Sequence, residues 1–120
     1  MKPIKIILAM LGTFLIPFGC SNTTEKVTTS YPQFVIEREI LGAGKLTTEE
    51  LKAAARKSCE VLRELGPEIQ WHHSYVTGDK VYCVYTAPNK ELIVKHAELV
   101  GVPANVISEV SSFVTPAIAQ

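Results

Sequence analysis

Two aromatic-rich segments separated by only two residues place the strongest constraint on the fold. Residues 69–77 (IQWHHSYVT) and 80–87 (KVYCVYTA) are rich in β-branched and aromatic side chains, and Gly78-Asp79 stands between them. So short a connection between two such segments is typical of a β-hairpin. We therefore expect two adjacent antiparallel strands in the middle of the chain, with Thr77 paired to Lys80.

A helical pattern precedes the hairpin, and a second one follows it. Residues 47–50 (TTEE) form a capping box, and the helix that begins there is expected to end at Gly66-Pro67. Asn89 is the expected N-cap of the second helix, which closes at Gly101. The side chains that recur at helical spacing are Leu51, Ala54, Ala55, Ser58, Cys59, Leu62 and Leu65 in the first helix, and Leu92, Ile93, His96, Ala97 and Val100 in the second.

A strand is expected at each end of this central part. Residues 34–40 alternate Ile36, Arg38 and Ile40 with Val35, Glu37 and Glu39, and residues 106–114 have the character of a final strand. The element order β-α-β-β-α-β predicts an α+β fold, a ferredoxin-like sandwich in which a four-stranded antiparallel sheet carries two helices on one face. This domain is expected over residues 34–116, followed by a short tail at 117–120.

Length and charge narrow the range of functions. The chain has 120 residues, which suits one domain, and it carries twelve basic against twelve acidic residues. It therefore lacks the surplus of positive charge that nucleic-acid binding requires, and we predict no nucleic-acid partner. Its mean hydropathy of +0.17 also argues against a disordered chain.

The first twenty residues have the pattern of an export signal. Lys2 and Lys5 precede an apolar run over residues 6–16 (IILAMLGTFLI), with no acidic residue among them. A positive segment followed by a short apolar one is typical of a secretory signal, and the run is short for a membrane-spanning helix. The sequence therefore predicts that the domain works outside the cytoplasm, in the periplasm or at the cell surface.

The end of this signal resembles a bacterial lipobox, in which Cys20 would be lipidated and become the first residue of the mature protein. Pro17 and Phe18 stand where a lipobox usually has Leu and a small residue. An ordinary cleaved signal and an uncleaved anchor are the alternatives. If Cys20 is modified, residues 21–33 serve as a linker between a membrane anchor and the domain.

The face of the sheet without helices, called here the open face, is the expected functional surface. Pairing back from the hairpin loop sets Ser74 opposite Cys83 and His72 opposite Tyr85. The side chains expected on the open face are Trp71, His73, Tyr75, Tyr82, Val84, Val35, Glu37 and Glu39. An exposed face of this composition favours association with a second copy of the chain.

A metal site is the chemistry that these residues suggest. His72 and His73 are adjacent, so on a regular strand they point to opposite faces, and only one of them is expected to join a site. We assign His73 as the imidazole ligand and Glu37, Glu39 and Glu109 as the oxygen ligands, a combination that suits divalent nickel, zinc, copper or non-haem iron. The alternative is that His73 is a hydrogen-bonded interface residue.

Three further features are assigned no role in this site. Cys59 and Cys83 both fall on core-facing positions, where they form either a disulfide or two buried thiols. His96 is expected at the edge of the second helix. The segment Gly42-Ala-Gly-Lys45 lacks the spacing of a phosphate-binding loop, so no nucleotide role is predicted for it.

Several contiguous blocks of the chain carry a family resemblance. They are residues 34–40 (FVIEREI), 42–45 (GAGK), 58–66 (SCEVLRELG), 71–77 (WHHSYVT), 81–85 (VYCVY), 87–89 (APN) and 103–110 (PANVISEV). Together they resemble a family of small nickel-binding proteins long known as a domain of unknown function. His73 matches the family, whereas His72 replaces an apolar residue. The resemblance implies a ferredoxin-like fold, a homodimer and nickel as the bound metal.

The sequence thus predicts an exported nickel-binding protein that sequesters or delivers its metal. Two other classes stay open. A small cofactor-free dimeric enzyme, of the oxygenase or isomerase type, would use His73 as general base and Tyr75 or Tyr82 as hydrogen-bond donor on the same face. A dimeric interaction module without catalytic activity would pack the open face away and bind no ligand.

Overall fold

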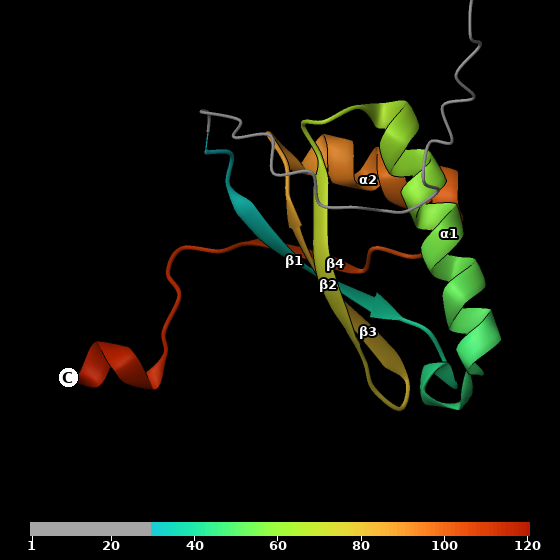
Figure 1. Cartoon of the computed structure of the whole chain (residues 1–120), viewed down its shortest axis with the longest axis horizontal. Coiled ribbons are helices and arrows are strands. Elements are labelled where there is room, and N and C mark those ends of the chain that lie inside the picture. The colour runs from blue at the N-terminus through green and yellow to red at the C-terminus, as the bar shows by residue number, and fades with distance from the viewer. Residues whose placement is uncertain (1–29) are drawn as a thin grey trace, which may run out of the picture.

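A four-stranded sheet with two helices forms the folded part of the chain (Figure 1). The structure is a computed structural model that describes residues 30–120, so the predicted export signal, Cys20 and most of the linker lie outside the described residues. Its elements are β1 (Gln33–Glu39), η1 (Ala43–Lys45), α1 (Thr48–Leu65), β2 (Gln70–Val76), β3 (Lys80–Thr86), α2 (Lys90–Val100), β4 (Val106–Glu109) and η2 (Pro116–Ala119).

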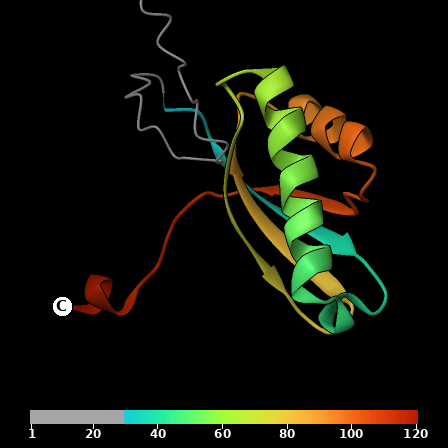
Figure 2. The same ribbon diagram turned by 45° about the vertical axis from the view of Figure 1, so that its right-hand side comes forward.

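The sheet has the strand order β2-β3-β1-β4, and all three neighbouring pairs are antiparallel. Both helices lie on the same side of it, as the turned view shows (Figure 2). This arrangement confirms the predicted ferredoxin-like fold. Among residues 30–120, neither α-helix covers the opposite side of the sheet, called the open face.

Both helices begin and end at the residues that their sequences indicate. At α1, the Glu50 amide donates to Thr47 Oγ1 (3.2 Å) and Glu50 Oε2 accepts from the Thr47 amide, which completes the capping box. At α2, the Leu92 amide donates to Asn89 Oδ1 (3.0 Å). Within residues 30–120, neither helix combines the length and the apolar character that crossing a bilayer requires.

The hairpin between β2 and β3 is closed by two residues and tied to η1. The Thr77 amide donates to the Lys80 carbonyl (2.9 Å), as the sequence predicts. The Gly44 amide donates to the Gly78 carbonyl (3.0 Å), and a Cβ at position 44 would lie 2.9 Å from the Thr77 oxygen. A glycine is therefore needed where η1 approaches the hairpin, which gives this glycine-containing segment a structural task.

The hydrophobic core lies between the sheet and the helices. Alternation along β1 buries Phe34, Ile36 and Arg38 and leaves Val35 and Glu37 on the open face. Ile36 and Ile93 are completely buried. The core cluster comprises Phe34, Ile36, Leu62, Ile69, Cys83, Tyr85, Ala87 and Ile93.

The last strand is shorter than the sequence suggests. The expected strand over residues 106–114 ends at Glu109, and only one further backbone bond follows, from the Val110 amide to the Gln33 carbonyl (2.8 Å). In the described part of the chain β4 is an edge strand that pairs with β1, and β1 itself begins at Gln33, so β4 has no strand to pair with beyond Val110. Phe113, which the strand would have included, lies in the segment beyond it and is 79% exposed.

Candidate functional site

A β-bulge interrupts β2 at the tandem histidines. Near the hairpin, Tyr75 pairs with Tyr82 and Ser74 with Cys83, as the sequence predicts. The register then shifts, so that His73 pairs with Val84 and Trp71 with Tyr85, and His72 is the extra residue between them. The expected pairing of His72 with Tyr85 is therefore wrong.

The bulge moves Trp71 to the helix-covered side of the sheet. Its indole Nε1 donates to Ser74 Oγ (2.9 Å), its ring stacks near Tyr85 with centroids 6.5 Å apart, and it packs against the core. The expectation that Trp71 lies on the open face is wrong, because one inserted residue reverses the alternation of every side chain beyond it.

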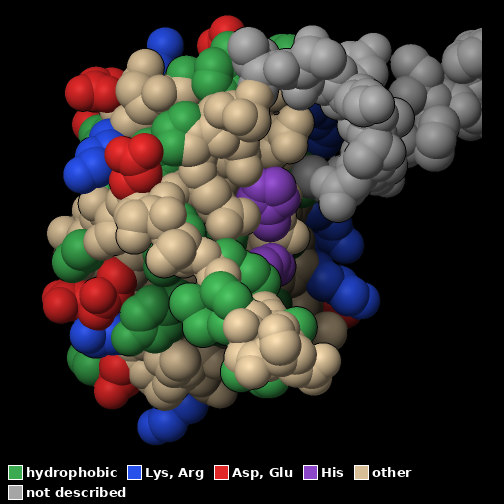
Figure 3. Space-filling model, turned by 90° about the vertical axis from the view of Figure 1, so that its left-hand side faces the viewer, with side chains coloured by type: hydrophobic (Ala, Val, Ile, Leu, Met, Phe, Trp, Pro, Cys, Tyr) green, Lys and Arg blue, Asp and Glu red, His purple; other side chains and the backbone are tan. Residues whose placement is uncertain are grey.

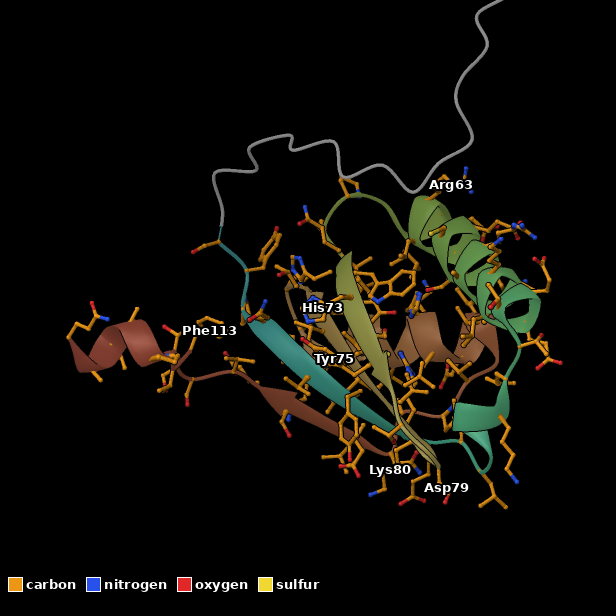
Figure 4. The ribbon with its side chains drawn as sticks, turned by 60° about the horizontal axis from the view of Figure 1, so that its bottom comes forward. Arg63, His73, Tyr75, Asp79, Lys80 and Phe113 are labelled. Carbon is orange, nitrogen blue, oxygen red and sulfur yellow. The ribbon has the colours of Figure 1, made fainter. Side chains whose placement is uncertain are left out.

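His73 lies on the open face with an exposed side chain. Its ring meets the ring of Tyr75 edge-on, with centroids 5.1 Å apart, and Tyr75 itself is 61% exposed. Figure 4 shows His73 and Tyr75 on the same strand, with Lys80 at the hairpin end of the sheet. The space-filling view shows exposed histidine side chains with hydrophobic ones next to them (Figure 3).

His72 is also exposed, and its Nε2 lies 2.6 Å from Thr86 Oγ1. Thr86 follows Tyr82 and Val84 at two-residue intervals along β3, and it therefore belongs to the open face. Partial burial, and next to it the charge of His73, lower the pKa of His72. The bulge thus brings both neighbouring imidazoles to one side of the sheet.

The predicted carboxylates lie further along the open face. Glu37 of β1 pairs with Tyr82 of β3, whereas His73 of β2 pairs with Val84. Glu37 therefore lies two residues nearer the hairpin along β3 than the partner of His73 does. Its carboxylate forms an ion pair with the Lys80 ammonium. The hydrogen bond to Glu37 is the main cause that raises the pKa of Lys80, and Glu39, which pairs with Lys80, adds to it.

The four predicted ligands do not come together in one chain. Two strand spacings, roughly 10 Å, separate the backbones of β2 and β1, with β3 between them. Glu109 pairs with Phe34, which faces the helices, so the in-register pairing of β4 with β1 directs Glu109 away from the open face. Among residues 30–120, no group of three or more His, Cys, Asp or Glu side chains is placed to hold a metal ion.

A polar cluster to which the sequence analysis assigns no role lies beneath the helices. His96, expected at a helix edge, is only 1% exposed, because α2 turns this side chain toward the sheet. Its Nε2 lies 3.1 Å from Ser58 Oγ, and its Nδ1 has no hydrogen-bond partner among the residues that the structure describes. Arg38 donates through Nη1 to the Pro103 carbonyl (2.6 Å) and through Nε to Cys83 Sγ (3.4 Å).

Burial dominates the titration of this cluster. It lowers the pKa of His96 to about 4, and the positive charge of Arg38 contributes to the shift. Burial also raises the pKa of Tyr85, against the opposing effect of a hydrogen bond with Ser58. Cys83 is a free, buried thiol, so the predicted alternative of a disulfide between Cys59 and Cys83 is wrong. The buried His96 and Tyr85 side chains are therefore both neutral near pH 7.

Comparison with known families connects this fold to a functional class. Residues 34–110 match the family model described as "Nickel responsive protein SCO4226-like". The chain belongs to this family. The match begins in β1 and extends through β4, so it includes the tandem histidines and every predicted metal ligand.

A solved member of this SCO4226-like family has the same fold. The chain matches the crystal structure of SCO4226 from Streptomyces coelicolor A3(2) with a TM-score of 0.59 and 19% sequence identity, over 68% of this chain and 99% of that one. No curated protein matches the chain. The structural likeness supports the βαββαβ architecture, whereas the nickel-responsive class comes from the family match.

Proposed function

We propose that this protein binds nickel through the open face of its sheet, and that it sequesters or delivers the metal outside the cytoplasm. The observation that carries the proposal is the exposed imidazole of His73 on the uncovered face of a domain from a nickel-responsive family. Imidazole and carboxylate are ligands that Ni²⁺ accepts, so the residues available on this face fit the metal.

One chain alone offers an incomplete site, which favours a homodimer. His73 and Glu37 lie on the same face but are separated by β3, and Glu37 is engaged by Lys80. In a twofold dimer that buries the open face, the carboxylates of one copy would approach the imidazole of the other. Val35, Tyr82 and Val84 would supply the apolar part of such an interface. We propose Glu37 and Glu39 as these carboxylates, and Glu109 is left out because it faces the other way.

Export through Met1–Cys20, with Cys20 as a lipid anchor, completes the proposal. Membrane fractionation of cells that express the full chain tests it, because a lipidated protein is recovered with the membranes and a Cys20→Ala protein is not. Recovery of both proteins in the same soluble fraction would contradict the anchor. It would leave the metal site unaffected.

Calorimetric titration with nickel tests the metal site. The protein, purified without an affinity tag, is expected to bind nickel, and His73→Ala is expected to abolish the binding. Gln70→Ala is a matched control, since Gln70 is an exposed residue of the same strand and its neutral amide is a poorer ligand for Ni²⁺ than imidazole. Equal heats for the original protein and His73→Ala would remove His73 from the site. No heat with the original protein would support the interaction module.

A further inference from the structure

The bulge in β2 gives the open face a second imidazole. A regular strand would place His72 opposite Tyr85, beneath the helices. His73 would then be the single histidine of this strand on the open face. The register shift between Trp71 and His73 prevents this, because Trp71 takes the inward position instead. Bulges often re-aim a side chain next to a functional site.

The environment of His72 resembles that of a metal-binding histidine before the metal is bound. Metal-ligating imidazoles usually donate one ring N–H to an oxygen, which fixes the ring and leaves the other nitrogen for the metal. His72 Nε2 lies 2.6 Å from Thr86 Oγ1. When Nε2 carries the proton and donates it to this hydroxyl, Nδ1 holds the free lone pair.

We propose that His72 is a nickel ligand through Nδ1, side by side with His73, and that Thr86 is the positioning residue that orients its ring. The inference rests on the proposed nickel function and extends it to a residue that regular strand geometry assigns to the other face. Each chain would then contribute two imidazoles from consecutive positions, and Thr86 would hold the ring of His72 by a hydrogen bond. Water or a second copy would complete the coordination.

The simplest rival is that His72 only hydrogen bonds Thr86 and is exposed as a by-product of packing Trp71 into the core. Nickel affinities of four proteins separate the two explanations: the original chain, His72→Ala, Thr86→Val and Gln70→Ala. We expect Gln70→Ala to bind like the original. Thr86→Val should weaken binding about tenfold, as loss of an outer partner does, and His72→Ala should weaken it by more than roughly 100-fold. Circular dichroism melting checks that each variant is folded.

X-ray absorption at the nickel edge provides a readout that does not depend on affinity. The His72→Ala complex, loaded at high nickel concentration, is expected to show one imidazole fewer per nickel than the original protein. Unchanged affinity and an unchanged imidazole count in His72→Ala, with binding lost in His73→Ala, would overturn the role of His72 and leave the proposed function standing. Failure of the original protein to bind nickel would overturn both.

Discussion

Histidine side chains have opposite environments on the two faces of the sheet. Beneath the helices, His96 is 1% exposed, its pKa is lowered to about 4, and it contacts Ser58 and Tyr85. On the open face, His72 and His73 are exposed to solvent. A histidine in the covered layer is thus held neutral as part of the packing, whereas the exposed pair is available to a ligand. The covered face therefore serves stability, and the proposed function assigns binding to the open face.

Removing an apolar side chain from β1 should reveal this division most strongly. Ile36 is completely buried, so Ile36→Ala is expected to lower the free energy of unfolding by about 3–4 kcal/mol through lost burial and the cavity left behind. Val35 is its neighbour on the open face and only half-buried, and Val35→Ala should cost roughly 1 kcal/mol. Urea unfolding measures both. Equal losses would contradict a core confined to the helical side.

The pH dependence of stability provides a second test of the covered face. Well above pH 6.5, His96 is neutral in both the folded and the unfolded chain and adds no pH dependence. As the pH falls from 6.5 toward 4, the unfolded chain takes up a proton that the folded chain resists, and stability decreases by about 3 kcal/mol. Urea unfolding at pH 7 and pH 4.5 measures this decrease. His96→Gln should reduce it, and an identical pH profile in that variant would exclude His96 as its source.

A substitution on the open face should change assembly and leave folding almost intact. Tyr75 is 61% exposed, so Tyr75→Ser is expected to alter the free energy of unfolding of the monomer by no more than about 0.5 kcal/mol. If the open face is the dimer interface, the same change weakens the dimer. Analytical ultracentrifugation of both proteins over a range of concentrations tests this. A dimer with the same dissociation constant in both would place the interface elsewhere.

The ion pair between Lys80 and Glu37 permits a finer test of the proposed ligands. Nickel bound to Glu37 would compete with the Lys80 ammonium, so Lys80→Met should raise nickel affinity roughly two- to fivefold. Lys52→Met is the control, because Lys52 is also paired with a glutamate but lies on α1. Calorimetric titration measures both variants. Unchanged affinity in Lys80→Met would remove Glu37 from the site.

Local signals in the sequence predicted those parts of the fold that depend on neighbouring residues. The capping box at Thr47 and the two-residue loop at Gly78-Asp79 are confirmed, and that loop fixes the pairing of Tyr75 with Tyr82. Each of these features is decided within a few residues. The element order that follows from them led to the correct fold class.

Features that depend on distant partners could not be predicted in this way. The end of β4 depends on where its partner β1 begins, at Gln33, and the depth of His96 depends on how α2 packs against the sheet. Nothing in the alternation of residues 70–76 marks His72 as the extra residue of a bulge. The bulge becomes evident only when β2 is paired with β3, and it changes which side chains share the open face.

Nuclear magnetic resonance of the imidazole nitrogens during a nickel titration tests the central claim most directly, because it observes both faces in one sample. The account predicts that the His73 signals shift or broaden as nickel is added, and that those of His96 stay unchanged until His73 is saturated. Early changes at His96 with His73 unaffected would contradict it.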